Sequence, residues 1–326
     1  MKIFAITEQR EGKWNSVSFE TLVAAQQIAG VQPGSSVTAA VIGKGARGLA
    51  DELSARQLAE ILLVEHDLLE RYTPDGFTIA LRQAIAQATP DLVLLPHTYQ
   101  VRDYAPKLAA ALGKGMIADC VGYRAEKDRL VFVRQMFQGK TAADVSFTGA
   151  PPWFVSFQAG AFRGDQIASG TAAAPIRSVQ IDLKPEQIRT KPLELFREAK
   201  QAVDLTQAPI LVAIGRGIKA PENIPMAEKL AKLLGGELAA SRPICDEGWL
   251  PMDRQIGSSG QTVAPKLYLA LGISGAIQHV VGMKGSRTIV AINKDQNAPI
   301  FEVADYGIVG DIFELIPALT EVLEKK

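Results

Sequence analysis

The sequence contains few of the residues on which metal centres and disulfide frameworks depend. Among its 326 residues are only two cysteines and three histidines, which lie far apart along the chain: Cys120, Cys245, His66, His97 and His279. Iron–sulfur clusters and structural zinc sites need several cysteine or histidine ligands at short spacings. We therefore expect no metal site and no disulfide framework, and a reduced, cytoplasmic protein.

The chain also lacks an excess of charge of either sign and any long apolar run. Lys and Arg together number 35, as do Asp and Glu, so the formal net charge is zero. A protein without a basic field does not attract nucleic acid or an anionic membrane in general. No apolar stretch approaches the roughly 18 residues that a membrane-spanning helix needs, and residues 1–7 are typical of a first strand rather than of a signal peptide. We expect no nucleic-acid partner and no membrane span.

The remaining composition is that of an ordinary folded protein. The chain is 47% apolar and 21% charged, which is typical of globular proteins. At about 150 residues per domain, its 326 residues predict two domains. We place the boundary in a charged stretch that contains Pro185 and Pro192, where the composition shifts. The expected domains are residues 1–190 and 209–326, with residues 191–208 as the linker.

The first half alternates short apolar runs with helical patterns. The apolar runs predict buried strands over residues 3–6, 37–42 and 91–95. Helices are expected between them, including one over residues 49–63. This alternation is typical of a doubly wound parallel sheet. The rhythm then changes, and we expect residues 118–183 to add antiparallel strands to the same domain.

The second half repeats one arrangement five times: an apolar run followed by a turn of Gly, Ser, Asn or Asp. The runs predict strands over residues 210–214, 237–240, 267–271, 288–292 and 306–309. Parallel strands place their carboxyl ends at one edge of a sheet, and ligands of open sheets bind beyond that edge. Glycine permits close backbone approach, and free N–H groups at helix starts suit phosphate oxygens. A long, phosphorylated, hydroxyl-rich cofactor fits such an edge better than a small metabolite.

The first of these turns, Gly215-Arg216-Gly217-Ile218-Lys219-Ala220, matches the G-x-G-x-x-A pattern of dinucleotide-binding proteins. Glu237 follows at about the required distance, but it begins a strand, whereas the acid that binds ribose should follow a strand's end. A conventional NAD site is therefore the weakest interpretation. A simple tight turn, or a turn that faces a phosphate or a flavin in another fold, both remain open.

Arg242 and His279 stand out by their positions. Arg242 follows a predicted strand, and beside a flavin its permanent charge would favour an anionic reduced form and raise the one-electron potential. His279 shares a predicted first helical turn with Ser274 and Gln278, where it could donate to a flavin carbonyl. A surface charge and a structural histidine are the alternatives. Residues 255–260 offer hydroxyls and amides to a ring edge, or form only a flexible loop.

Seven motifs in the second half resemble, in order, those of the α subunit of electron transfer flavoproteins, the FixB family. They occupy residues 212–217, 241–243, 263–268, 272–279, 288–295, 298–301 and 303–309. The resemblance implies a first domain of the adenine nucleotide hydrolase-like type, which packs on a β subunit in a heterodimer. It also implies a Rossmann-like, deoxyhypusine synthase-like second domain that holds FAD.

The resemblance further implies which residues meet the FAD. The matching positions are Arg216, Ser241, Arg242, Gln255, Ile256, Gly257, Ser258, Ser259, Ser274, Gly275, Ala276, Ile277, Gln278, His279, Asn293, Asp311 and Ile312. By the family pattern, Arg242 and His279 would tune the flavin, and Ser259 would bond its N5 edge. The ribityl, pyrophosphate and adenosine portions would be served by Ser274, Gln278, Asn293 and Asp311.

One loop departs from the family pattern. The family commonly has Gln-Thr before a glycine, whereas this chain has Ser258-Ser259-Gly260. Ser259 keeps the hydroxyl group but lacks the methyl group of threonine, and Ser258 lacks the amide of glutamine. FAD binding is still expected, and the redox potential and the choice of partner are left open.

The implied function is that of an electron carrier subunit rather than a stand-alone enzyme. It would accept electrons from flavoprotein dehydrogenases, such as acyl-CoA dehydrogenases of fatty acid oxidation. It would pass them singly to an electron transfer flavoprotein–quinone oxidoreductase or another acceptor, with the FAD domain swivelling on residues 184–207. One alternative is an electron-bifurcating complex that couples NADH oxidation to ferredoxin reduction. Others are an NAD-dependent enzyme on a related fold and a structural subunit with an empty site.

Overall fold

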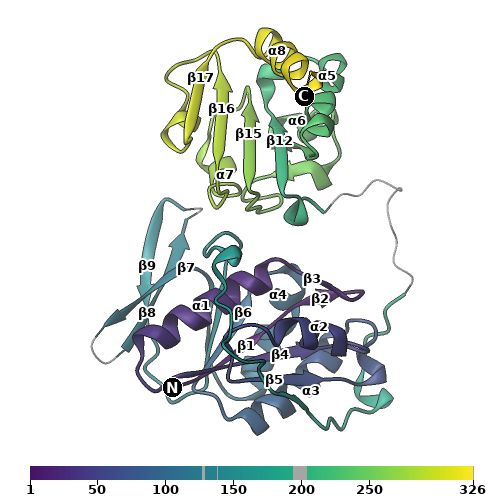
Figure 1. Cartoon of the computed structure of the whole chain (residues 1–326), viewed down its shortest axis with the longest axis vertical. Coiled ribbons are helices and arrows are strands. Elements are labelled where there is room, and N and C mark those ends of the chain that lie inside the picture. Colours follow the sequence, from purple (N-terminus) through teal and green to yellow (C-terminus); the bar gives the residue numbers. More distant parts are fainter. Residues whose placement is uncertain (127–128, 138, 194–203, 326) are drawn as a thin grey trace. The chain divides into compact units, whose positions relative to one another are not determined.

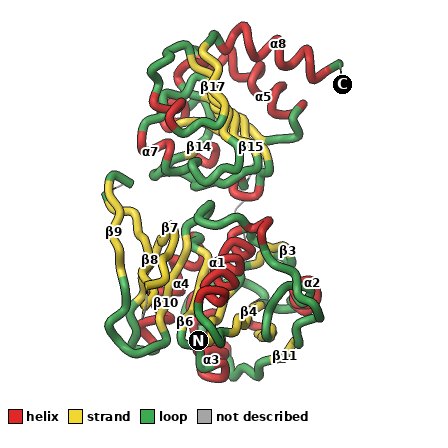
Figure 2. Tube along the Cα trace, turned by 60° about the vertical axis from the view of Figure 1, so that its left-hand side comes forward, coloured by secondary structure: helices red, strands yellow, loops and turns green. Residues whose placement is uncertain are grey.

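The chain forms two compact units, each built on its own β-sheet (Figure 1, Figure 2). The computed structural model describes residues 1–126, 129–137, 139–193 and 204–325. The prediction of two α/β domains, one with added antiparallel strands and one fully parallel, is confirmed. The exact boundaries stay predictions, because residues 194–203 of the expected linker lie outside the described residues.

The first unit is built on a nine-stranded sheet. Its strands are β1 (Lys2–Ile6), β4 (Ser36–Ile42), β5 (Glu60–Val64), β6 (Leu92–Pro96), β7 (Met116–Glu126), β8 (Arg129–Met136), β9 (Thr141–Val145), β10 (Trp153–Phe157) and β11 (Ile176–Ser178). Their order across the sheet is β11-β5-β4-β1-β6-β10-β7-β8-β9. The pairs from β11 to β7 are parallel, and β8 is antiparallel to β7. A separate hairpin joins β2 (Gln9–Arg10) and β3 (Lys13–Trp14).

Helices cover both faces of this sheet, as in a doubly wound fold. Successive residues of β1 point to opposite faces, so Ile3 lies in one core and Phe4 in the other. The first core receives α1 (Val17–Val31) and α2 (Arg47–Leu53), and the second receives α3 (Pro74–Ala88) and α4 (Tyr99–Ala111). Hydroxyl caps begin the last two helices: Thr73 accepts from the Gly76 N–H, and Thr98 accepts from the Val101 N–H.

The prediction of a helix over residues 49–63 is wrong in its second half. Helix α2 ends at Leu53, and β5 begins at Glu60. The run Ile61-Leu62-Leu63-Val64 is uninterrupted and apolar, so periodicity alone does not distinguish a strand from a helix. In the structure all four residues are buried and the strand pairs with β4 in parallel register. Burial on both faces accounts for the missing alternation.

The prediction of antiparallel strands over residues 118–183 holds only for part of that range. Strands β7 and β8 form the expected antiparallel pair. Strand β10, however, lies between β6 and β7 and is parallel to both, and β11 is parallel to β5. Phe154 packs in one core and Phe157 in the other, so β10 needs the covered, central place that it occupies.

The second unit has a six-stranded, fully parallel sheet of order β14-β13-β12-β15-β16-β17. The strands are β12 (Ile210–Ile214), β13 (Glu237–Ser241), β14 (Gln255–Ile256), β15 (Leu267–Leu271), β16 (Ile289–Asn293) and β17 (Tyr306–Val309). The five predicted strands are all present. Strand β14 was not predicted, because two residues carry no pattern.

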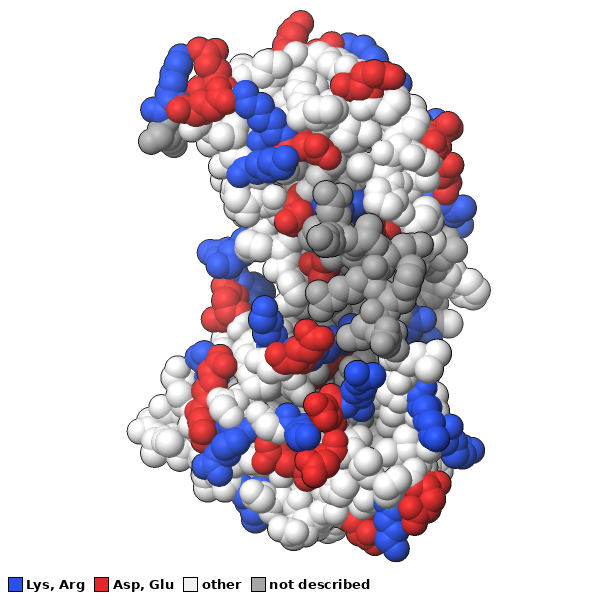
Figure 3. Space-filling view, turned by 90° about the vertical axis from the view of Figure 1, so that its right-hand side faces the viewer, with Lys and Arg blue, Asp and Glu red and all other residues white. Residues whose placement is uncertain are grey.

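Both faces of the second sheet are covered as well. Helices α5 (Ile224–Leu233), α6 (Arg242–Asp246) and α8 (Ile312–Glu324) pack on one face. The other face packs against the segment that contains Met283 and against the 3-10 turn η8 (Pro299–Glu302), near α7 (Ile277–Val280). None of the helices in the described residues is long and apolar enough to cross a membrane. On the face seen in Figure 3, acidic and basic side chains are interspersed, in keeping with their equal numbers.

Candidate functional site

The second sheet changes its winding direction at β12. The chain passes from β12 to β13 on one side and later returns to β15 on the other. The turns that follow β12 and β15 therefore diverge at the carboxyl edge, which is where open parallel sheets form a ligand crevice. A cavity of about 680 Å³ lies at this edge, within the second unit.

Most of the residues that sequence analysis assigned to the cofactor line this cavity. Twelve do so: Arg216, Ser241, Arg242, Ile256, Gly257, Ser258, Ser259, Ser274, Ala276, Gln278, His279 and Asn293. Five are not part of its wall: Gln255, Gly275, Ile277, Asp311 and Ile312. The structure thus brings together side chains from five turns that are up to 77 positions apart in the sequence, from Arg216 to Asn293.

The glycines after β12 serve contact between two loops. A Cβ atom on Gly215 would lie 2.4 Å from the carbonyl oxygen of Gly272, and one on Gly217 would lie 2.6 Å from the Gly272 Cα. The Gly217 N–H donates to that same carbonyl at 3.1 Å. The turn continues as the 3-10 turn η5 (Arg216–Ile218), and the next α-helix begins only at Ile224. The turn therefore lacks the helix start on which a conventional NAD fingerprint binds pyrophosphate.

Gly275 holds the second loop in place from behind the cavity. Its φ is +84°, and a Cβ atom there would lie 2.1 Å from the backbone nitrogen of Ile300. The Ile300 N–H donates to the carbonyl of Ser274 at 3.1 Å. Only glycine allows both this backbone conformation and this approach. Gly275 thus sets the position of Ser274 and Ala276 on the wall.

Gln255 has a similar supporting role for Ser259. The Gln255 side chain is buried, and its Nε2 donates to the Ser259 hydroxyl at 3.0 Å. The Ser258 N–H donates to the carbonyl of Gln278 at 2.7 Å, which ties this loop to α7. The Ser259 hydroxyl can still donate its own hydrogen to a ligand.

Two arginines supply positive charge at the wall. Arg242 is the first residue of α6, and its Nε donates to the Asp246 carboxylate at 3.1 Å. Its side chain is 65% exposed, so the other guanidinium N–H groups remain accessible. Arg216 is also exposed, in η5. Both charges persist at any physiological pH.

His279 differs from the arginines because it is buried and neutral. Its exposed fraction is 6%. Burial lowers the pKa of His279 to about 4, and this effect outweighs the opposing effect of the Ile256 backbone. Its Nε2 lies 2.9 Å from the hydroxyl oxygen of Tyr268. Its Nδ1 is buried with no hydrogen-bond partner in the described part of the chain.

The remaining assigned residues fall into two groups. Asn293 lines the cavity, and its amide donates to the carbonyl of Ile273 at 2.8 Å, which fixes the side chain. Asp311 instead caps α8 by accepting from the Phe313 N–H at 3.0 Å, and it pairs with Lys294 at 2.6 Å. Ile312 is buried in the core under α8. Ile277 is 46% exposed.

Sequence reasoning missed eight residues of the wall. They are Gly215, Gly217, Pro243, Gly272, Ile273, Asp295, Ala298 and Pro299. Four of them, Gly215, Gly217, Pro243 and Ile273, are next to an assigned residue, and Gly272 and Asp295 lie two positions from one. Ala298 and Pro299 lie in a motif that carried the resemblance but received no role. Tyr268 was also missed, since a tyrosine inside a strand gives no sign that its hydroxyl meets His279.

The fold and the cavity define a protein that binds a nucleotide cofactor at the carboxyl edge of a parallel sheet. The wall offers hydroxyls, amides, guanidinium groups and one neutral imidazole. In the described residues, no group of three or more His, Cys, Asp or Glu side chains is arranged to hold a metal ion.

Comparison with known proteins gives the family. The model of the electron transfer flavoprotein FAD-binding domain matches residues 204–284, and that of the electron transfer flavoprotein domain matches residues 3–184. The chain is 39% identical to electron transfer flavoprotein subunit alpha of Thermoanaerobacterium thermosaccharolyticum, over 99% of this chain and 98% of that one. It is 38% identical to the subunit of the same name in Bacillus subtilis, over 98% and 96%. It is 33% identical to acryloyl-CoA reductase electron transfer subunit beta of Anaerotignum propionicum, over 99% and 95%.

The chain therefore belongs to the α-subunit family of electron transfer flavoproteins. It is an electron carrier subunit with FAD as its cofactor, and membership of this family implies a β-subunit partner. The residues present fit FAD. Residues from the turns after five strands line the cavity. The buried Nδ1 of His279 has no hydrogen-bond partner in the described residues, and a bound ligand could satisfy it.

Proposed function

We propose that this subunit, with its β partner, accepts electrons from flavoprotein dehydrogenases such as acyl-CoA dehydrogenases. It passes them one at a time to a quinone oxidoreductase or another acceptor. The observation that carries this proposal is the makeup of the wall: two permanent cations, hydroxyls and amides surround the cavity. Such a wall binds and tunes a redox cofactor, and it offers no nucleophile paired with a base for substrate chemistry.

The individual roles follow from the positions of the side chains. Bound FAD supplies the redox chemistry of its isoalloxazine ring. We propose that Arg242 stabilises negative charge on the reduced ring, that Ser259 bonds the ring edge and that His279 donates to it. The phosphate and hydroxyl portions are held by Ser274, Gln278 and Asn293 on the wall. Gln255 supports the Ser259 hydroxyl and Gly275 supports the loop of Ser274. Asp311 holds the start of α8 by accepting from the Phe313 N–H.

The domain roles are also part of this proposal. Residues 1–190 would pack on the β subunit, residues 191–208 would link the two domains, and residues 209–326 would carry the FAD. Cytoplasmic location stays a prediction, which fractionation of the source cells would test.

A bifurcating complex is the second candidate. The relative from Anaerotignum propionicum is named as an electron transfer subunit of acryloyl-CoA reductase, so at least one member of this family serves a reductase by name. A bifurcating complex would carry a second FAD, mainly in the β subunit. Two FAD per heterodimer, with NADH-dependent reduction of ferredoxin, would select this candidate.

The role of Arg242 gives the sharpest test of the proposal. We expect Arg242→Ala in the heterodimer to weaken binding of reduced relative to oxidised flavin about tenfold, which lowers a one-electron potential by roughly 59 mV. Arg242→Lys should recover part of this loss, because it keeps the charge but not the planar fork. Lys229→Ala is the matched control, since it removes one exposed cation from α5, which contributes nothing to the cavity wall.

Spectroelectrochemical titration of the three variants measures these potentials. Equal shifts in Arg242→Ala and Lys229→Ala would show that only the overall charge matters. The proposal would then lose its assignment of Arg242.

A further inference from the structure

Tyr268 is the most deeply buried polar side chain near the cavity. It lies inside β15, its exposed fraction is 0%, and it is absent from the cavity wall. Its hydroxyl oxygen lies 2.9 Å from Nε2 of His279, and the two rings meet edge to face with their centroids 6.1 Å apart. Tyr268 therefore contacts a wall residue from the side of the core.

The direction of this hydrogen bond follows from the buried groups that each choice leaves unpaired. If Nε2–H donated to Tyr268, the phenolic hydrogen would have no acceptor in the described residues, and Nδ1 would be a bare acceptor without a donor. If Tyr268 donates to Nε2, the phenol is satisfied and Nδ1 carries the hydrogen. Buried polar groups are nearly always paired, so the second choice is favoured.

The surroundings support the same direction. Burial raises the pKa of Tyr268 far above its ordinary range, so the phenol keeps its hydrogen. No charged side chain of the described residues shifts the pKa of either group.

We propose that Tyr268 is a positioning residue that holds the His279 ring as the neutral Nδ1–H tautomer. The ring then has one remaining donor, the buried Nδ1–H, which has no partner in the described residues and is assigned to an acceptor on the flavin. This inference rests on the proposed role of His279 at the flavin. It assigns the orientation and tautomer of that ring to a residue that never touches the cofactor.

The tautomer can be read directly by nuclear magnetic resonance on the heterodimer with ¹⁵N-labelled histidine. The chain has three histidines, and His279→Gln identifies the resonances of interest. His66 is an internal reference of the opposite kind, because its Nδ1 accepts the Leu68 N–H at 3.1 Å. A neutral His66 must therefore carry its hydrogen on Nε2. We expect His279 to show a protonated Nδ1 and an unprotonated Nε2 at pH 7, the reverse of neutral His66.

Tyr268→Phe removes only the phenolic oxygen, and Tyr306→Phe is the matched control on the exposed strand β17 of the same unit. In Tyr268→Phe we expect the Nε2 resonance of His279 to move toward the average of two tautomers. The FAD potential should shift in the same direction as in His279→Gln, by no more than that variant shows. Tyr306→Phe should change neither signal.

An Nε2–H tautomer in the wild-type protein would overturn the proposal, whether or not Tyr268→Phe folds. So would an unchanged His279 spectrum in a folded Tyr268→Phe variant. Neither result depends on electron transfer. Failure of the proposed function would appear separately, as a heterodimer without FAD or without exchange of electrons with dehydrogenases.

Discussion

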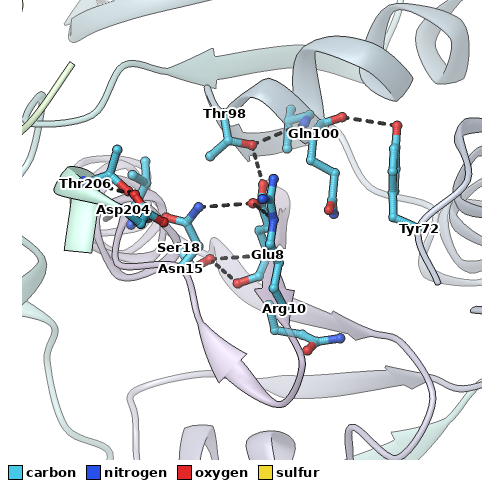
Figure 4. A network of polar contacts seen from close by, with 12 residues as sticks. Glu8, Arg10, Asn15, Ser18, Tyr72, Thr98, Gln100, Asp204 and Thr206 are labelled. Atoms are coloured by element: carbon cyan, nitrogen blue, oxygen red, sulfur yellow. Dashed lines mark hydrogen bonds and ion pairs between the residues drawn. The ribbon is translucent and has the colours of Figure 1, made fainter. Parts of the chain in front are cut away.

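The carboxyl edges of the two sheets differ in whether their turns leave room for a ligand or bond to one another. Each sheet changes winding direction at its first long strand: β1 lies between β4 and β6, and β12 lies between β13 and β15. At the edge of the second sheet, the turns leave a cavity of about 680 Å³. At the edge of the first sheet, the corresponding turns carry polar side chains that bond to one another (Figure 4).

Glu8 is the centre of that first network. It follows β1, its exposed fraction is 2%, and its carboxylate accepts hydrogen bonds from Asn15 at 3.0 Å and from the Thr98 hydroxyl (Figure 4). Its backbone N–H donates to the Ser18 hydroxyl at 2.8 Å. A buried carboxylate would also repel a phosphate at this position.

The comparison teaches that the fold alone does not make either edge a binding site. Both edges have the geometry at which ligands of open sheets bind. The first centres on a buried carboxylate, Glu8, which bonds to Asn15 and Thr98 and pairs with Arg10. The second surrounds a cavity with hydroxyls, amides and two exposed arginines. Changes at the second edge should therefore affect FAD, and changes at the first should affect only stability.

The largest effect on cofactor binding is expected from Gly275→Ala. Its new Cβ would lie 2.1 Å from the backbone nitrogen of Ile300, and backbone atoms cannot move aside cheaply. We expect FAD occupancy of the heterodimer to fall at least tenfold, measured by flavin absorbance after gel filtration, because ~1.4 kcal/mol of strain relieved on loss of the cofactor suffices for that change.

Gly43→Ala makes the same change at the edge of the first sheet. There the Cβ would lie 2.4 Å from Nε2 of Gln9, the end of a flexible side chain, although φ of +144° still adds strain. We expect this variant to be less stable but to keep its FAD. If both variants lost FAD to the same extent, the conclusion that only the edge of the second sheet binds FAD would be wrong.

A second effect concerns the pH dependence of stability in the first unit. Burial raises the pKa of Glu20 in α1 from 4.5 to about 8, although the N–H of Gly160 donates to this carboxyl group at 2.7 Å. Between these pH values the folded chain holds a proton that the unfolded chain releases. The free energy of unfolding therefore falls as the pH rises from 4.5 to 8.

Glu20→Gln should remove that slope. We expect its stability advantage over the wild type to be roughly 2–4 kcal/mol greater at pH 8 than at pH 5. In a Trp249→Phe background, Trp14 and Trp153 are the remaining tryptophans, so urea unfolding followed by fluorescence reports the first unit. An equal difference at the two pH values would show that Glu20 is not held protonated.

The smallest effect is expected from Glu8→Gln. The amide keeps one oxygen acceptor but places an N–H₂ group against the Asn15 amide or the Thr98 hydroxyl. We expect the first unit to lose about 1–3 kcal/mol in urea unfolding followed by the same fluorescence signal. FAD content and potential should not change. A loss of FAD in this variant would mean that the first edge takes part in cofactor binding.

The strands of the second unit could be predicted because each is an apolar run closed by a turn residue. That their turns share an edge followed from the parallel arrangement. The twelve individual wall residues were assigned by the resemblance to the family. Contact of Asp311 and Ile312 with FAD was likewise implied by the resemblance, and the structure places them at and behind the start of α8.

What the sequence could not show depends on pairing between distant segments. The strand β10 is central only because β6 and β7 accept it on both sides. The short strand β14 exists only as an extension beside β13. The contact of Tyr268 with His279 requires the loop after β15 to turn back over its own strand. No short stretch of sequence predicts these pairings and contacts between segments.

The most direct measurement is the number of FAD molecules per heterodimer, in the wild type and in Gly275→Ala. The account predicts that the wild-type heterodimer carries one FAD, or two if the complex bifurcates, and that Gly275→Ala carries one fewer. A wild-type heterodimer without FAD, or a Gly275→Ala variant with the full number, would contradict the placement of the cofactor at the edge of the second sheet.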